Sequence, residues 1–333
     1  MKIIESKPNI NWRNIKSNVE IQNVIKEFDE LLNNESFNGL KKINSRLNLK
    51  NFRKLKVSKK EFEECSNYLS DDEKFSLYEA IKNISFVCKS QLNSSSKSIE
   101  PINGLSIWDK YVPISSVGLY VPGGTAPLVS SFLMQVIPAL TANCPDINVC
   151  TPPSKNGKIH PAILWLANQL NVTNIYKIGG AQAILSLANG YLDLPKVDKI
   201  FGPGNSYVAE AKKYVSSKVA IDLYAGPSEV MVVTNSEKNT SIAAIDALSQ
   251  LEHGSDSCAF VLSKSKKILN KVKKEIKVLS EKLSRESLIN SAMDNIILIK
   301  CKSDNDVINM VNDCAPEHLA VSYTHLTLPT NGT

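Results

Sequence analysis

Two short stretches of this chain combine side chains that could perform chemistry near neutral pH. Glu317 and His318 follow Pro316, and a histidine beside a carboxylate can act as a general base. Gln250 and His253 are three residues apart, so on a helix they share one face and can reach a single ion. Imidazole nitrogen with amide oxygen suits Zn²⁺, although glutamine is an unusual ligand. Two plainer interpretations stay open: an exposed loop pair for the first, and a helix-end histidine satisfied by a neighbour for the second.

Four glycine-rich stretches form another kind of candidate site, and we expect each to lie where a strand ends and a helix begins. They read Val121-Pro-Gly-Gly-Thr-Ala-Pro127, Gly179-Gly-Ala-Gln-Ala183, Phe201-Gly-Pro-Gly-Asn-Ser-Tyr207 and Tyr224-Ala-Gly-Pro-Ser-Glu229. In an open parallel sheet, ligands bind at the carboxyl ends of the strands, where glycine admits a ligand and a helix N-terminus offers N–H groups to a phosphate. The stretches therefore predict a dinucleotide or phosphate site. Gly-Pro turns are also common connectors, and none of the stretches matches the GxGxxG fingerprint.

The elements that must position these residues alternate between strand and helix from about residue 114 onward. Short apolar strands are expected near 114–121, 146–150, 174–178, 196–201 and 219–223, each followed by a helix or a glycine-rich turn. Further strands are expected near 229–234, 258–263 and 296–299. Such alternation favours parallel sheets with helices on both faces. The fold class is therefore α/β, with two doubly wound, incomplete Rossmann-like parallel-sheet domains and N-terminal helices.

The predicted domain division is discontinuous. Residues 1–100 read as polar helices that need a surface to pack on, so we expect residues 1–118 and 230–321 to form one α/β domain. Residues 119–229, which hold the glycine-rich stretches, are expected to be an inserted α/β domain that binds the nucleotide.

Composition indicates an ordinary globular protein. The 333 residues are 43% hydrophobic and 22% charged with a net charge of +6, and the lysines of 41–60 and 264–282 fit solvated helix faces, so nucleic-acid binding is not expected. The seven cysteines are odd in number and have no CxxC spacing, which favours reduced thiols in the cytoplasm. The first residues lack a signal-peptide core, and no apolar run reaches the ~18 residues that span a bilayer.

Six blocks in this order resemble histidinol dehydrogenase over roughly residues 10–321. The blocks are Val117-Gly-Leu-Tyr-Val-Pro-Gly-Gly124, Gly179-Gly-Ala-Gln182, Gly202-Pro-Gly-Asn205, Ala225-Gly-Pro-Ser-Glu229, Gln250-Leu-Glu-His-Gly254 and Ala315-Pro-Glu-His-Leu319. The resemblance implies a cytoplasmic homodimer that oxidises L-histidinol through L-histidinal to L-histidine, the last step of histidine biosynthesis, with NAD and Zn²⁺ as cofactors. It also makes residues 119–229 the NAD-binding domain.

The resemblance further implies a role for each matched residue. The expected assignments are NAD contacts at Tyr120, Gln182 and Asn205, zinc ligands at Gln250 and His253, substrate contacts at Ser228, Gln250, His253 and His318, and acid–base catalysis by Glu317 and His318. Two alternatives stay open: a dehydrogenase of the same superfamily that acts on another amino or sulfonate alcohol, and a non-catalytic or truncated paralogue that binds nucleotide only.

The sequence departs from the family pattern after Val321. Residues 322–333 match no family segment, so we expect them to be a foreign tail, and we assign no ligand role to His325. The family pattern continues with a further Asp and His that bind zinc, the His coming from the partner subunit, and with a substrate-binding Glu. With two of four ligands, the polypeptide as written is expected to bind zinc weakly and to turn over poorly.

Overall fold

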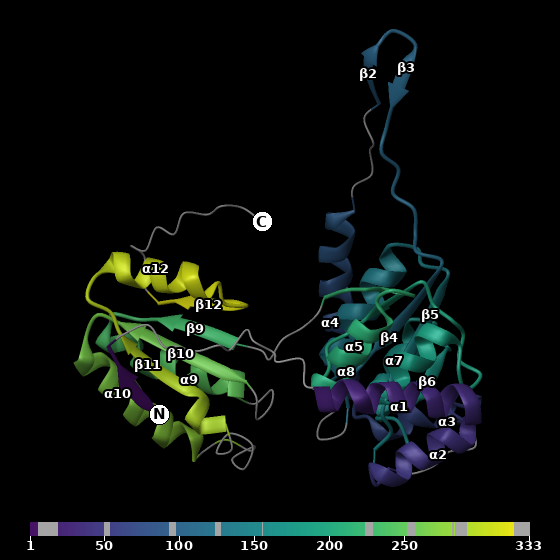
Figure 1. Cartoon of the computed structure of the whole chain (residues 1–333), viewed down its shortest axis with the longest axis horizontal. Coiled ribbons are helices and arrows are strands. Elements are labelled where there is room, and N and C mark those ends of the chain that lie inside the picture. The colour runs from purple at the N-terminus through teal and green to yellow at the C-terminus, as the bar shows by residue number, and fades with distance from the viewer. Residues whose placement is uncertain are drawn as a thin grey trace. The chain divides into compact units, whose positions relative to one another are not determined.

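The computed structural model describes residues 1–5, 19–49, 54–92, 98–123, 128–154, 156–223, 229–251, 257–281, 283 and 292–322. The chain forms two compact units (Figure 1). Unit 1 combines Met1–Ile15 with Gly226–Thr333, and unit 2 is the continuous segment Lys16–Ala225. Each unit is built around its own parallel sheet.

The sheet of unit 2 has the strand order β6-β5-β4-β7-β8, and all neighbouring strands are parallel. Its strands are β4 (Ser116–Tyr120), β5 (Asp146–Thr151), β6 (Ile175–Lys177), β7 (Lys199–Phe201) and β8 (Ala220–Ile221). The chain adds β5 and β6 on one side of β4, then returns to place β7 and β8 on the other side. The order therefore reverses between β4 and β7, and this is the point where ligands bind in doubly wound sheets.

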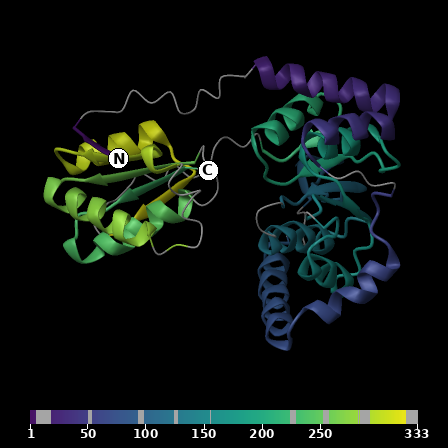
Figure 2. The same ribbon diagram turned by 90° about the horizontal axis from the view of Figure 1, so that it is seen from below.

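Helices cover both faces of this sheet (Figure 2). The helices of unit 2 are α1 (Val19–Glu35), α2 (Phe37–Arg46), α3 (Lys59–Glu64), the 3₁₀ turn η1 (Cys65–Tyr68), α4 (Asp71–Gln91), α5 (Val129–Thr141), α6 (Pro161–Gln169), α7 (Gly180–Asn189) and α8 (Ser206–Val215). One apolar core joins α1, α2, α7 and α8 to one face of the sheet, and a second joins η1, α5 and α6 to the other, with α4 at its margin. The predicted doubly wound architecture is confirmed.

The N-terminal helices differ from the predicted domain division. We expected residues 1–118 to pack with 230–321, but α1 to α4 belong to unit 2. The cause is the apolar stripe of α1, in which Ile25, Phe28 and Leu32 are buried in the same core as α7 and α8. The boundary near residue 229 differs by only a few residues from the prediction, since unit 2 ends at Ala225.

Unit 1 also has a parallel sheet with one reversal of strand order. Its sheet has the order β1-β11-β10-β9-β12 with all pairs parallel, so the chain again reverses direction, between β9 and β12. Helices α9 and α10 cover one face and α12 the other (Figure 2). The elements are β1 (Lys2–Ile4), β9 (Glu229–Val233), η2 (Glu237–Asn239), α9 (Thr240–Leu251), β10 (Cys258–Ser263), α10 (Lys266–Ser280), η3 (Met293–Asn295), β11 (Ile296–Lys300), α12 (Asp304–Cys314) and β12 (His318–Val321).

Three of the four glycine-rich stretches follow a strand at the carboxyl edge of the sheet in unit 2, as predicted. They come after β4, β6 and β7, and the second and third lead directly into α7 and α8. The fourth stretch was expected to precede a helix, but it lies between β8 and β9, where the chain passes from unit 2 to unit 1. The expectation was wrong there because the next apolar segment is a buried strand of the other sheet. Residues 124–127 and 224–228 lie outside the described residues.

A two-stranded hairpin extends from unit 2 beyond its helices (Figure 1). It consists of the antiparallel strands β2 (Ile99–Ile102) and β3 (Leu105–Ile107). Every residue of the two strands is exposed. Among the described helices, none has the length and apolar character needed to cross a membrane.

A close backbone contact joins β4 and β7 at the reversal point. Gly202, directly after β7, has φ +124°, and a Cβ atom there would lie 2.0 Å from the carbonyl oxygen of Tyr120 and 3.0 Å from Oε1 of Gln135. Real Cβ contacts do not occur at 2.0 Å, and L side chains rarely adopt this φ. Only glycine fits this position without moving the end of β4.

We predict that Gly202→Ala lowers the free energy of unfolding by about 3–5 kcal/mol, because it combines backbone strain with a backbone clash. The matched control is Gly104→Ala in the hairpin turn, where φ is also positive (+84°) but a Cβ would meet nothing within 4 Å. That control is expected to cost only about 1 kcal/mol. Urea denaturation followed by circular dichroism measures both. Equal losses in the two variants would contradict the importance of the contact.

Candidate functional site

The first candidate site lies at the carboxyl edge of the unit 2 sheet. Tyr120 ends β4, Gln182 lies in the first turn of α7, and Asn205 precedes α8. The topology thus brings all three residues that the sequence predicted for the nucleotide to one edge of one sheet. The N-termini of α7 and α8 open at the same edge, and their free N–H groups favour an anionic ligand.

Tyr120 and Gln182 are linked through the glycine-rich turn before α7. The Tyr120 hydroxyl accepts a hydrogen bond of 3.0 Å from the Gly180 N–H. Both side chains are buried, and Oε1 of Gln182 has no hydrogen-bond partner among the described residues. A buried acceptor without a partner is costly, so this oxygen is suited to receive a donor from a bound ligand.

Asn205 holds the start of α8. It is the N-cap residue, and its Oδ1 accepts a hydrogen bond of 3.1 Å from the Val208 N–H. The residue itself is exposed. Its side-chain oxygen is therefore committed to the helix, whereas its NH₂ group faces an environment open to solvent. Such a residue can both order the loop and donate to a ligand.

Other residues at this edge were missed by sequence reasoning. Gln135 of α5 donates from Nε2 to the Tyr120 carbonyl (3.2 Å), while its own Oε1 is buried without a described partner. Lys212 and Asp222 form an ion pair that also bonds both backbone groups of Gly202. Gln135 could have been suspected as a polar residue inside an apolar helix. Nothing in the sequence marks Lys212 or Asp222, because each resembles an ordinary surface charge.

The second candidate site lies at the amino edge of the unit 1 sheet. Gln250 is in the last turn of α9, and α9 runs back toward the amino ends of the strands. His318 begins β12 and Glu317 precedes it, next to β9. Helices α9 and α12 end at this edge, and the partial negative charge of helix C-termini favours cations there. Ser228 and His253 lie outside the described residues, so their roles and the helical spacing of Gln250 and His253 stay predictions.

Glu317 and His318 lie close to each other. Oε1 of Glu317 is 3.8 Å from Nε2 of His318, and both side chains are more than half exposed. The Glu317 N–H donates to Oε1 of Glu229 at 3.3 Å, which ties the start of β12 to the start of β9. The pair is therefore accessible to a small molecule and held by backbone pairing, as a general base and its neighbour require.

Gln250 has the surroundings expected of a ligand. Its side chain is buried, and Nε2 finds no hydrogen-bond partner among the described residues. Rotating the amide by half a turn places Oε1, the atom that binds cations, at the unpartnered position. Across the described part of the chain there is no group of three or more His, Cys, Asp or Glu able to hold a metal. Gln250 thus fits one position of a metal site that needs ligands from outside this set.

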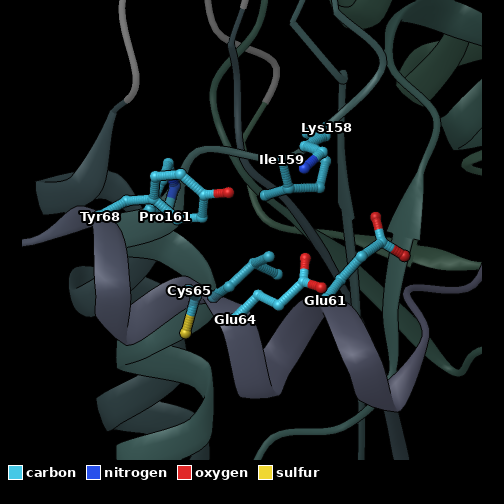
Figure 3. Close-up of a pocket in the computed structure, with 8 residues that line it drawn as sticks. Glu61, Glu64, Cys65, Tyr68, Lys158, Ile159 and Pro161 are labelled. Carbon is cyan, nitrogen blue, oxygen red and sulfur yellow. The ribbon is translucent and has the colours of Figure 1, made fainter.

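A small pocket in unit 2 shares no lining residue with either candidate site (Figure 3). It is enclosed by α3, η1 and the start of α6, and none of its lining residues was predicted as functional. The lining residues are Glu61, Glu64, Cys65, Tyr68, Lys158, Ile159, Pro161 and Leu164.

Comparison with known proteins gives one consistent result. The family model of histidinol dehydrogenase matches residues 11–329, which extends beyond Val321. Histidinol dehydrogenase of Bacteroides thetaiotaomicron is 44% identical over 268 residues, covering 80% of this chain and 62% of that protein. The enzyme of Legionella pneumophila strain Paris is 38% identical over 300 residues, covering 88% and 69%. The crystal structure of histidinol dehydrogenase from Elizabethkingia anophelis has a TM-score of 0.88 at 35% identity, covering 98% of this chain and 76% of that chain.

The two parallel sheets with the same reversal of strand order define an α/β protein of the doubly wound class. Within that class, the chain belongs to the histidinol dehydrogenase family. It spans 62% of the length of the Bacteroides thetaiotaomicron relative.

The buried hydroxyl of Tyr120 gives a pH-dependent prediction. Burial raises the pKa of Tyr120 above its ordinary value of 10.0, and the hydrogen bond from Gly180 only partly offsets this. The Tyr120 hydroxyl therefore ionises at a lower pH in the unfolded chain than in the folded chain. The stability that comes from this difference is complete below the unfolded pKa of about 10 and is lost as the pH rises past it. We predict that Tyr120→Phe is less stable by about 1–2 kcal/mol near neutral pH, because the Gly180 N–H loses its acceptor. This difference should shrink as the pH rises through about 10.

Urea unfolding at neutral and alkaline pH measures the difference. Tyr111→Phe is the control, because Tyr111 is 74% exposed. A difference between wild type and Tyr120→Phe that is constant with pH would contradict the burial effect.

Proposed function

We propose that the protein represented by this chain is a histidinol dehydrogenase that oxidises L-histidinol through L-histidinal to L-histidine with NAD, as the last step of histidine biosynthesis. The proposal is carried by the combination of family membership with the reversal-point edge that holds Tyr120, Gln182 and Asn205. Seven free cysteines support a reducing compartment, and we place the protein in the cytoplasm.

The carboxyl edge of unit 2 would bind NAD, which supplies the hydride acceptor for both oxidations. The N-terminal N–H groups of α7 and α8 would bind its pyrophosphate. Gln182 would accept a hydrogen bond at its unpartnered Oε1, and Asn205 would donate one from its NH₂ group. Tyr120 would order the turn at Gly180 and contribute an apolar ring surface.

The amino edge of unit 1 would supply the proton chemistry. Oxidation of an alcohol requires loss of the hydroxyl proton, and neutral His318 can accept it at a ring nitrogen. The second oxidation requires addition of water to the aldehyde, and the Glu317 carboxylate can activate that water. The 3.8 Å separation of the two side chains lets both act at one small substrate. Ser228 would contact the substrate from the start of β9.

Gln250 and His253 would hold Zn²⁺ and contact the substrate as well. Bound zinc would fix the position of the substrate and so orient the reacting carbon. Two observations support the placement: the buried amide of Gln250, whose Nε2 has no partner among the described residues, and the helix C-termini at this edge. Two ligands are half of the usual tetrahedral set, so the remaining ligands would come from other segments.

We also propose that the protein is a homodimer, as the family resemblance implies. The arm, defined as residues 98–112, exposes seven large apolar side chains and has no core of its own. They are Ile99, Ile102, Leu105, Ile107, Trp108, Tyr111 and Val112. An isolated two-stranded hairpin is marginally stable in water, so a second copy of the chain that covers these side chains would stabilise it.

The activity is tested with L-histidinol, NAD⁺ and Zn²⁺ by the absorbance of NADH. In a protein that also carries the remaining zinc ligands, we expect two NADH per histidinol, and we expect His318→Asn to lower turnover by about 10²–10⁴-fold while leaving the zinc content unchanged. Gln250→Leu is the matched variant and should lose zinc, which elemental analysis measures. His160→Asn is the control, because His160 caps α6 in unit 2.

Three outcomes would contradict these roles. Undiminished turnover in His318→Asn removes that residue from the role of base. Undiminished zinc in Gln250→Leu removes it from the ligand set. Binding of NAD⁺ without NADH formation from histidinol, or from a panel of amino and sulfonate alcohols, would instead favour a nucleotide-binding protein without dehydrogenase activity.

The homodimer is tested by analytical ultracentrifugation. We predict that the double variant Ile102→Ser, Trp108→Ser raises the dimer dissociation constant by at least about tenfold, because buried aromatic side chains dominate interface energies. Ile242→Ser is the control, since Ile242 is 55% exposed on α9 of unit 1 and is not part of the arm. A wild-type chain that sediments as a monomer would contradict the proposal.

A further inference from the structure

A closed ring of hydrogen bonds surrounds the peptide groups of Gly202. The Gly202 N–H donates to Oδ2 of Asp222 at 2.8 Å, and the Gly202 carbonyl accepts from Nζ of Lys212 at 3.0 Å. The ring closes through an ion pair between Nζ of Lys212 and Oδ1 of Asp222. Lys212 lies in the second half of α8 and Asp222 follows β8, so three successive elements meet at one residue.

The ring is an expensive arrangement for a protein interior. The side chain of Lys212 is only 4% exposed, and that of Asp222 is 26% exposed. Burying a lysine carries a desolvation cost that an ion-pair partner often offsets only in part, and well-packed apolar residues often stabilise such positions more. A gain in stability is therefore a weak explanation for burying the Lys212–Asp222 pair. Fixing one backbone conformation of Gly202 is a stronger explanation.

The conformation that the ring fixes is the one on which the nucleotide edge depends. Gly202 is pressed against the end of β4, and its φ of +124° is outside the usual range of L residues. Gln135 donates a hydrogen bond to the Tyr120 carbonyl at the same contact. A rotation of the Gly202 peptides would move the turn that leads to Asn205 and with it the N-terminus of α8.

We propose that Lys212 and Asp222 are positioning residues of the nucleotide site, which hold the Gly202–Asn205 turn in the conformation that receives the pyrophosphate of NAD. The inference rests on the proposed function of this edge and extends it to two residues outside the set matched to the family. Neither residue contacts the nucleotide in this role. Asp222 fixes the orientation of the Gly202 N–H, and Lys212 fixes the orientation of the Gly202 carbonyl.

The test compares NAD⁺ affinity with stability in the full chain. We expect Lys212→Met to raise the NAD⁺ dissociation constant by about tenfold or more, because small displacements of a preorganised site are costly. Isothermal titration calorimetry measures the affinity. Hydrogen exchange of residues 202–208 without ligand should also become faster. The control is Lys213→Met, the next residue of α8, whose side chain is 50% exposed.

A double variant separates positioning from stability. Lys212→Met combined with Asp222→Asn removes both charges and leaves an amide oxygen to accept the Gly202 N–H, so no charge is buried alone. If the pair positions the turn, urea stability recovers in the double variant while NAD⁺ affinity stays low, because the Gly202 carbonyl still lacks its donor. Recovery of wild-type affinity together with stability would overturn the proposal, as would unchanged affinity in Lys212→Met.

Failure of the underlying function is recognised separately. If the wild-type chain does not bind NAD⁺, the proposed function of this edge fails at the first titration, and the positioning role fails with it. If the wild type and Lys213→Met bind equally and Lys212→Met binds as they do, only the positioning role fails.

Discussion

The contact between Gly202 and the carbonyl of Tyr120 is the constraint on which the carboxyl edge of the unit 2 sheet depends. A parallel sheet that is wound in both directions has one place where two neighbouring strands diverge into helices on opposite faces, and here that place is between β4 and β7. The backbones approach so closely that no side chain fits at Gly202. The positions of Asn205, of the α8 N-terminus and of the end of β4 all follow from this single approach.

Both units have a parallel sheet with one reversal of strand order, but their candidate sites lie at opposite edges of the two sheets. In unit 2 the matched residues lie where strands end and helices begin, so helix N-termini collect there and favour anions. In unit 1 Gln250, Glu317 and His318 lie where helices end and strands begin, so helix C-termini collect there and favour cations. One supersecondary arrangement thus yields two electrostatic environments, suited to a pyrophosphate and to a metal ion.

Much of the fold could be predicted because buried parallel strands are apolar runs and glycine-rich turns mark their ends. β4, β5, β9 and β10 were all found within one or two residues. The sheet that the N-terminal helices pack against could not be predicted, because the apolar stripe of α1 fits any exposed sheet face. The ring of hydrogen bonds at Gly202 could not be predicted either, because Lys212 and Asp222 are recognised only by their bonds to backbone groups distant in the chain.

The pairing of β1 with β11 has a consequence for how the protein is made. Lys2 lies beside Ile297 in the sheet of unit 1, whereas unit 2 is one uninterrupted segment between them. During synthesis, unit 2 can therefore acquire its core while the ribosome is still translating β9 to β12. The β1 strand must remain unpaired until β11 has been translated, so its backbone groups stay open to other partners while unit 2 is being made.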